Sequence, residues 1–258
     1  MDVRPIGVYD SGVGGISLWR AIRSSLPDES IIYLGDGKNC PYGEKSSSEI
    51  IDLSFKAVET LLSRGCKMIV IACNTATSTA IQALREAYPQ IPFVGMEPAV
   101  KPACAQTKSG IVAVLATKRS LESDLFEDSV AKYSAGVEVI RQVGEGFVQI
   151  VEDGEEQSEK AFAMIKPIID MIYEKGADKI VLGCTHYPFL MEPINRAIAG
   201  RKIDVIDPSE AIVRRIEKLM SQAEMAAPKG AEVKDEFISF ANSDYVNKLI
   251  NRAKWMIT

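Results

Sequence analysis

The chain has 258 residues, of which 47% are hydrophobic and 25% are charged, and its formal net charge is −5 at pH 7. This composition is typical of a globular protein, and the length suits one large domain or two ordinary domains. No cluster of Lys and Arg is present, so we expect neither a nucleic-acid partner nor an anionic membrane surface. The first apolar run, 6–16, is too short and too Gly-rich for a signal peptide or a membrane span, which favours a cytoplasmic protein.

Short apolar runs alternate along the chain with segments of helical periodicity. The expected strands are 6–9, 31–34, 68–72, 91–96, 111–115, 137–140, 179–182 and 203–206, and the expected helices include 16–26, 49–64, 76–88, 159–175 and 209–223. This alternation predicts an α/β fold with mostly parallel sheets and helices on both faces.

The C-terminal region has a different pattern. Segment 222–236 is polar, contains Pro228 and Gly230, and is the most linker-like part of the chain. The residues after it are typical of a strand and then a helix that is capped near Ser243 or Asp244. That strand needs a sheet to join, and we place it on the first half of the chain.

Two strand ends repeat each other. Residues 68–75 read MIVIACNT and residues 179–186 read KIVLGCTH, so each apolar run ends in a small residue and a cysteine, Cys73 or Cys184. Gly65 and Gly176 precede these cysteines at the same distance, and each suits a helix C-terminus that needs positive φ. We therefore predict two similar domains, 1–97 with 208–258 and 98–207. Because ligands bind at the carboxyl ends of parallel strands, two thiols there indicate one site built from two halves.

The turn DSGVGG, Asp10 to Gly15, follows the first strand and opens a helix. Its glycines allow a sharp turn that exposes backbone N–H groups to an anion. A carboxylate-binding turn and a simple strand–helix turn with Asp10 as a cap are equally compatible with these residues.

The loop 35–49 contains Pro41-Tyr42-Gly43 and then a run of serines that can cap a helix. Its backbone N–H groups could contact a ligand, although the residues alone favour an ordinary surface loop.

The cysteines are the sharpest candidates for chemistry. Each of Cys73 and Cys184 precedes an expected helix start, where the helix dipole favours the thiolate. His186, the only histidine, follows Cys184 by two residues and can exchange a proton near neutral pH. Cys66 and Cys104 are expected to be structural, and Cys40 lies in the 35–49 loop with no clear assignment. The residues around Glu152 favour a solvated helix end.

Taken together, these motifs resemble the glutamate racemases of the aspartate/glutamate racemase superfamily. The matching segments are IGVYDSGVGG, GDxxxxPYG, VIACNTAT, MEPAVKPA, VLATKRS and VLGCTHYP, in this order. The resemblance implies two pseudo-twofold-related α/β domains with the active site at their interface. It also implies cofactor-independent interconversion of L- and D-glutamate for peptidoglycan synthesis, with no metal, in a homodimer.

The resemblance also implies roles for individual residues. Cys73 and Cys184 are the two catalytic bases, with Cys184 acting on L-glutamate and Cys73 on D-glutamate. Asp10 assists the first cysteine, whereas His186 and Glu152 assist the second. The substrate contacts are Asp10, Ser11, Tyr42, Gly43, Asn74, Thr75, Thr117, Thr185 and His186.

Some residues depart from the pattern of the family. Gly37 and Lys38 stand where relatives usually carry a small hydroxyl residue and Ala, Cys40 replaces an apolar residue, and Ser120 replaces Thr. These departures affect fine contacts and the mobility of the loop, not the reaction.

Three alternatives remain open at the level of the sequence. Aspartate could replace glutamate as the substrate. Cys73, Cys184 and His186 have residue types that suit zinc, although their spacing matches no compact zinc motif and only Cys40 is available as a fourth ligand. A non-catalytic binding module would leave the paired thiols unexplained.

Overall fold

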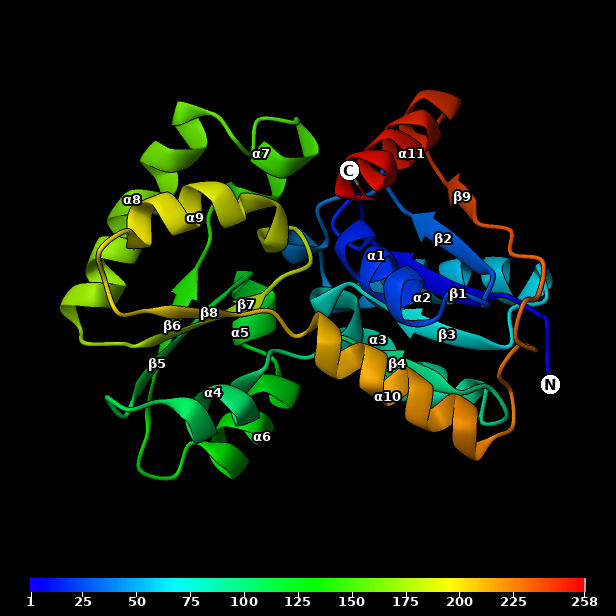
Figure 1. Ribbon diagram of the computed structural model, residues 1–258, viewed down its shortest axis with the longest axis horizontal. Coiled ribbons are helices and arrows are strands. Elements are labelled where there is room, and N and C mark those ends of the chain that lie inside the picture. Colours follow the sequence, from blue (N-terminus) through cyan, green and yellow to red (C-terminus); the bar gives the residue numbers. More distant parts are fainter. Residues whose placement is uncertain (258) are drawn as a thin grey trace. The chain divides into compact units, whose positions relative to one another are not determined.

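The computed structural model describes residues 1–257, which form two compact units (Figure 1). Unit 1 comprises Met1–Met96 and the segment from Ser209 to the end of the described chain, and unit 2 comprises Glu97–Pro208. Both units are α/β, and all strand pairs in both sheets are parallel, as predicted.

Unit 1 has a five-stranded sheet with the order β4-β3-β1-β2-β9. Helix α1 packs against α10 and α11, and α2 packs against α3. The elements of unit 1 are β1 (Ile6–Asp10), α1 (Ile16–Ser25), β2 (Ile31–Gly35), the 3₁₀ helix η1 (Tyr42–Glu44), α2 (Ser47–Ser63), β3 (Met68–Ile71), α3 (Asn74–Ala87), β4 (Phe93–Gly95), α10 (Ser209–Gln222), β9 (Glu236–Ser239) and α11 (Ser243–Ile257).

Unit 2 has a four-stranded sheet with the order β6-β5-β7-β8. Helices α8 and α9 pack together, and α4 packs against α6 (Figure 1). The elements of unit 2 are α4 (Val100–Gln106), β5 (Ile111–Ala116), α5 (Lys118–Leu121), α6 (Asp124–Tyr133), β6 (Glu138–Val143), α7 (Phe147–Glu152), α8 (Glu159–Glu174), β7 (Lys179–Gly183), the 3₁₀ helix η2 (Tyr187–Leu190), α9 (Met191–Ile198) and β8 (Asp204–Ile206).

The two sheets have the same topology. In each unit the first strand lies between the second and the third, and the fourth flanks the third. β3 and β7 are therefore equivalent third strands, and Cys73 and Cys184 both follow them. The repeat that the sequence predicts is thus present in the strand order.

The two helices before β3 and β7 end in the same way. Gly65 follows α2 with φ +80°, and Gly176 follows α8 with φ +82°. In each case the glycine N–H and the next N–H bond to carbonyls of the last helical turn, Leu62 and Leu61 in α2 and Tyr173 and Ile172 in α8. This is the Schellman pattern, and it confirms the predicted helix ends.

The C-terminal segment returns to unit 1, where β9 pairs in parallel with β2. The N-cap of α11 is Asn242, whose Oδ1 accepts from the Tyr245 N–H at 3.1 Å, one residue before the predicted cap. The irregular segment before β9 is not a loose linker, because Glu29 Oε1 accepts from the Ala227 N–H at 2.7 Å and the buried Lys67 ammonium donates to the Met225 carbonyl at 2.8 Å.

Within residues 1–257, none of the helices combines the length and the apolar character that crossing a membrane requires.

Candidate active site

Cys73 lies at the carboxyl edge of the unit 1 sheet. It follows β3, is 5% exposed, and is the N-cap of α3, so the predicted helix start is confirmed. Its Sγ accepts from the Ala76 N–H at 3.5 Å and lies 3.5 Å from the Ser11 Oγ. An N–H donor at a helix N-terminus stabilises negative charge on sulfur, so this position favours a thiolate.

Asp10 ends β1, next to β3, and its side chain is fully buried. Its Oδ1 accepts from the Gly12 N–H at 2.9 Å, whereas the N-cap of α1 is Gly15. Asp10 therefore organises the turn and is not a helix cap. A Cβ at Gly15 would lie 2.7 Å from the Asp10 Cβ, so this position requires glycine.

Asn74 and Thr75 form the first residues of α3, and both are buried. The Asn74 amide donates to the Met96 carbonyl at 3.4 Å. Its Oδ1 is buried and has no hydrogen-bond partner among the described residues. A buried acceptor without a donor is costly, so Asn74 is suited to an incoming donor such as an ammonium group.

Tyr42 and Gly43 lie in η1, in the loop that follows β2. The Tyr42 ring is 1% exposed, and its hydroxyl donates to Asp36 Oδ2 at 2.7 Å. The phenol is therefore committed inside unit 1, and burial holds its pKa well above the usual value. What this loop can offer a ligand is its backbone and not the tyrosine hydroxyl.

The second cysteine lies at the carboxyl edge of the unit 2 sheet. Cys184 follows β7, and its Sγ lies 3.9 Å from Nδ1 of His186. The other ring nitrogen of His186, Nε2, lies 2.8 Å from Oε1 of Glu152 at the end of α7. The His186 and Glu152 side chains are only 2% and 9% exposed, so Glu152 is not the solvated helix end that its neighbours in the sequence favour.

The chain after Cys184 differs from the prediction. It forms a turn and the short helix η2, in which the Tyr187 N–H bonds to the Cys184 carbonyl at 3.1 Å, and α9 begins only at Met191. Pro188 has no N–H to donate to the Cys184 carbonyl, so a helix that began directly after Cys184 would lack its first i→i−4 hydrogen bond. Cys184 therefore has a histidine partner where Cys73 has a helix N-terminus.

Hydroxyl side chains lie at equivalent places in the two units. The β1–β3 register, extended by two residues, places Ser11 opposite Cys73, and the β5–β7 register, extended by one, places Thr117 opposite Cys184. The Thr117 Oγ1 caps α5 and lies 2.9 Å from the Ser120 Oγ. Thr185, beside Cys184, is buried.

All five cysteines of the chain are free thiols. The three that lie outside the two motifs, Cys40, Cys66 and Cys104, have different surroundings. Burial raises the pKa of the Cys66 thiol to about 12, and it also raises the pKa of Cys104. Both thus stay protonated, in agreement with a structural role. Cys40 is half-buried and precedes a cis peptide bond to Pro41.

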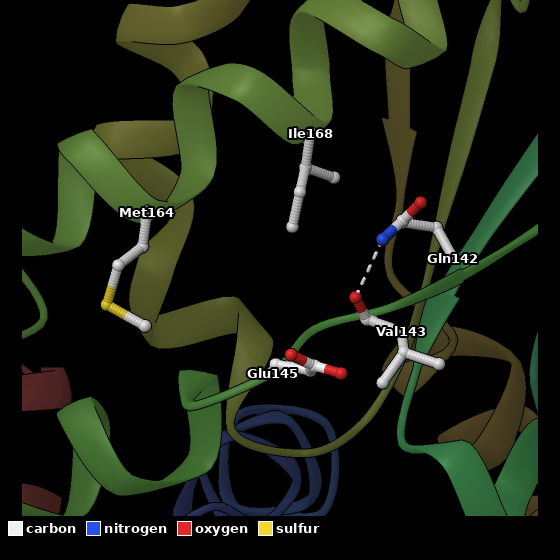
Figure 2. A pocket seen from close by; sticks show the side chains of 5 residues that line it. All are labelled: Gln142, Val143, Glu145, Met164 and Ile168. Atoms are coloured by element: carbon white, nitrogen blue, oxygen red, sulfur yellow. Dashed lines mark hydrogen bonds between the residues drawn. The ribbon is translucent and has the colours of Figure 1, made fainter.

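A pocket of about 460 Å³ lies elsewhere in unit 2 and is lined by Gln142, Val143, Glu145, Met164 and Ile168 (Figure 2). The Gln142 amide donates to the Val143 carbonyl at 2.8 Å. None of the predicted site residues lines this pocket.

Sequence reasoning missed Asp36 and the two tyrosines Tyr9 and Tyr187. Burial, and then the charge of the neighbouring cysteine, hold the pKa of Tyr9 and of Tyr187 well above the usual value, so each thiol has a neutral phenol nearby. The matching position of Asp10 and Asp36 after neighbouring strands is a signal that could have identified Asp36.

Comparison with known proteins identifies the family of this chain. A glutamate racemase from Herpetosiphon aurantiacus is 42% identical over 249 residues, which are 96% of this chain and 97% of that protein. The glutamate racemase from Francisella tularensis in complex with D-glutamate is 27% identical with a TM-score of 0.85, covering 100% of this chain and 95% of the other. The Escherichia coli glutamate racemase in complex with L-glutamate and the activator UDP-MurNAc-ala is 30% identical with a TM-score of 0.83, covering 97% and 95%. The model of the Asp/Glu/Hydantoin racemase family matches residues 17–216. The chain belongs to the Asp/Glu/hydantoin racemase family.

Proposed function

We propose that this protein interconverts L-glutamate and D-glutamate, with Cys73 and Cys184 as the two bases. The observation that carries the proposal is that each unit has a buried thiol after its third strand, with its own polar partners. The relatives that are 42% identical over almost the whole chain act on glutamate, and two related structures contain its L- and D-forms.

The reaction needs a base on one face of the α-carbon and an acid on the other. One cysteine, as a thiolate, takes the α-proton, and the electron pair of the broken C–H bond remains on the substrate. The other cysteine, as a thiol, gives its proton to the opposite face and becomes a thiolate. The Ala76 N–H stabilises negative charge on Cys73, and His186, held by Glu152, assists proton transfer at Cys184.

Polar groups beside the thiols hold the substrate in this proposal. Asn74 Oδ1 accepts from the substrate ammonium group, because it has no other donor among the described residues. Ser11, Thr75, Thr117 and Thr185 supply hydroxyls, and Tyr42 and Gly43 supply backbone N–H groups. Asp10 contributes to both the substrate site and proton transfer at Cys73.

The decisive test is circular dichroism of L-glutamate incubated with the protein. We expect loss of the signal as D-glutamate forms, and loss of this activity by at least about 10³-fold in Cys73→Ala and in Cys184→Ala, since a methyl group cannot exchange a proton. Cys104→Ala is the matched control and should keep full activity. Full activity in either Cys73→Ala or Cys184→Ala would contradict the two-thiol mechanism.

Cofactor and substrate are tested in the same assay. No Lys lies in either cysteine motif to form a Schiff base, so activity should need no pyridoxal phosphate. Activity that is lost with a chelator and restored by a divalent ion would support the zinc alternative. Faster turnover of aspartate than of glutamate would favour the aspartate alternative.

The cellular role follows from the reaction. D-glutamate formed in the cytoplasm would supply peptidoglycan synthesis, and we propose that the active species is a homodimer. Growth of a bacterial strain that requires D-glutamate, when it expresses this chain but not Cys73→Ala, tests the role. Light scattering of the purified protein tests the dimer.

A further inference from the structure

Asp36 is a buried carboxylate that the proposed reaction does not use. It follows the last residue of β2, its side chain is fully buried, and its N–H donates to the Asp10 carbonyl at 2.9 Å. It thus lies at the same sheet edge as Asp10. No ion pair among the described residues includes Asp36.

The carboxylate of Asp36 is satisfied by the loop that follows it. It accepts from the Asn39 amide at 3.0 and 2.9 Å and from the Tyr42 hydroxyl at 2.7 Å. Buried carboxylates are costly without hydrogen bonds, so the loop must take the conformation that delivers these donors. The Tyr42 ring also packs edge-on against Tyr9, with centroids 6.3 Å apart.

We infer that Asp36 is a positioning residue, which fixes loop 36–43 so that the backbone of Tyr42 and Gly43 meets the substrate. This inference rests on the proposed function, since only there do Tyr42 and Gly43 contact glutamate. Asp36 acts through the Tyr42 hydroxyl and the Asn39 amide and touches no reacting atom.

The test is the kinetics of Asp36→Asn, Tyr42→Phe and the double variant. Asn has nearly the same shape as Asp, but its NH₂ group opposes the donors of Asn39 and Tyr42. We expect KM for glutamate to rise roughly tenfold in Asp36→Asn with a much smaller change in kcat, since hydrogen bonds to charged groups are strong. The KM of the double variant should be no higher than that of the poorer single variant, because both substitutions break the same hydrogen bond between Tyr42 and Asp36.

Asp235→Asn is the matched control. Asp235 accepts from the Arg23 guanidinium and from the N–H of Ile31, the first residue of β2. It therefore lies at the end of β2 that is opposite to Asp36. This variant should lower Tm without raising KM. The inference is overturned if KM in Asp36→Asn stays within twofold of wild type, or if it rises only as much as in Asp235→Asn.

Hydrogen exchange of loop 36–43 separates this inference from the proposed function. Faster exchange in Asp36→Asn than in wild type, confined to this loop, is expected whether or not the protein acts on glutamate. If the wild type is inactive and the loop of Asp36→Asn still exchanges faster than that of wild type, the proposed function is overturned and Asp36 remains the anchor of the loop. Unchanged exchange would overturn the anchor itself.

Discussion

The Glu152–His186–Cys184 chain is the clearest example of chemistry set by single residues. A carboxylate accepts hydrogen bonds, so Glu152 keeps a proton on Nε2 of His186, 2.8 Å away. In the neutral imidazole Nδ1 is then the acceptor, and it faces the Cys184 thiol at 3.9 Å. In the proposed mechanism, Glu152 thereby selects the tautomer of His186 that can take a proton from this cysteine.

Replacing Glu152 by Gln tests this role. The Gln amide can donate to Nε2 and so favours the opposite tautomer, in which Nδ1 carries the proton. We expect kcat for glutamate racemisation to fall roughly 10²-fold, within the range for general acid–base catalysis, while Tm changes little. Glu145→Gln is the control, because Glu145 is exposed and precedes the same helix. Equal activities of the two variants would contradict the role of Glu152.

For single residues, the sequence predicted which side chains belong to the candidate site better than it predicted their hydrogen-bond partners. Cys73, Cys184 and His186 could be chosen as candidates because they lie in two short motifs that repeat a cysteine after an apolar run. Glu152 could not be assigned from its neighbours, since its partner His186 is 34 residues away in the chain. The place of Asp36 at a strand end could have marked it as a candidate, but its partners Asn39 and Tyr42 could not be predicted, because they depend on how the following loop folds back.

Among the elements, the C-terminal helix explains one departure from the family pattern. A Cβ at Gly37 would lie 2.1 Å from Cζ of Tyr245 in α11 and less than 2.5 Å from two more ring atoms. The tyrosine ring thus occupies the space that a hydroxyl-bearing residue would need. Gly37 and Tyr245 fit each other as a pair.

The substitution Gly37→Ser should therefore destabilise the protein. Because the ring must move, we expect a loss of about 1–3 kcal/mol in the free energy of unfolding, as in other overpacked sites. The loss should be much smaller when Gly37→Ser is made in a Tyr245→Ala background. Urea denaturation of the four proteins gives both values. Equal costs of Gly37→Ser in the two backgrounds would show that the ring is not responsible.

The turn between α4 and β5 makes stability depend on pH. Burial acts to raise the pKa of Asp178, but bonds from the Thr107 hydroxyl and the N–H groups of Lys108 and Ser109 outweigh it, so the pKa lies below the ordinary 3.8. A lowered folded-state pKa contributes stability above the unfolded pKa, and this is lost as pH falls through the folded value.

Asp178→Asn should consequently lower Tm at pH 7, where the carboxylate is ionised in both states. The difference in Tm from wild type should shrink as pH falls below about 4, because the wild-type carboxylate becomes protonated there. Thermal unfolding of both proteins between pH 7 and pH 2.5 measures this. A difference that stays constant over the whole range would rule out the Asp178 carboxylate as its source.

Most elements could be predicted because buried parallel strands form continuous apolar runs and their helices have a 3.6-residue period. The eight apolar runs all contain strands, and β9 joins unit 1 as expected. The start of the helix after Cys184 was wrong, because the effect of Pro188 on a single turn is not visible in the periodicity. The tethering of segment 223–235 depends on side chains far along the chain and could not be predicted either.

For the whole molecule, the main result is that the two units share the order of their first four strands but surround their thiols with different groups. Both place a thiol after the third strand and a hydroxyl residue after the first. However, Cys73 is supported by a helix N-terminus and lies near Asp10, whereas Cys184 is supported by His186 and Glu152. The residues themselves predicted the repeat, and the resemblance to the family implied different partners for the two cysteines, but the distances between these partners needed the structure.

The asymmetry predicts that the two proton transfers can be slowed separately. The L- and D-enantiomers are equally stable in water, so kcat/KM must be equal in the two directions for every variant and cannot reveal the difference. A primary isotope effect can, because it reports how far removal of the α-proton from one particular enantiomer limits the rate. In the proposed reaction Cys184 removes the proton of L-glutamate and Cys73 that of D-glutamate.

His186→Asn should slow transfer at Cys184 in both directions. The isotope effect on kcat/KM for α-deuterated L-glutamate then rises toward its full value, and the effect for α-deuterated D-glutamate falls, because removal from the D-form becomes reversible. Asp10→Asn should produce the opposite pair of changes, since Asp10 ends the strand beside β3. Measuring both isotope effects for wild type and the two variants gives the complete pattern. If both variants shift the two isotope effects in the same direction, His186 and Asp10 do not serve separate faces of the substrate.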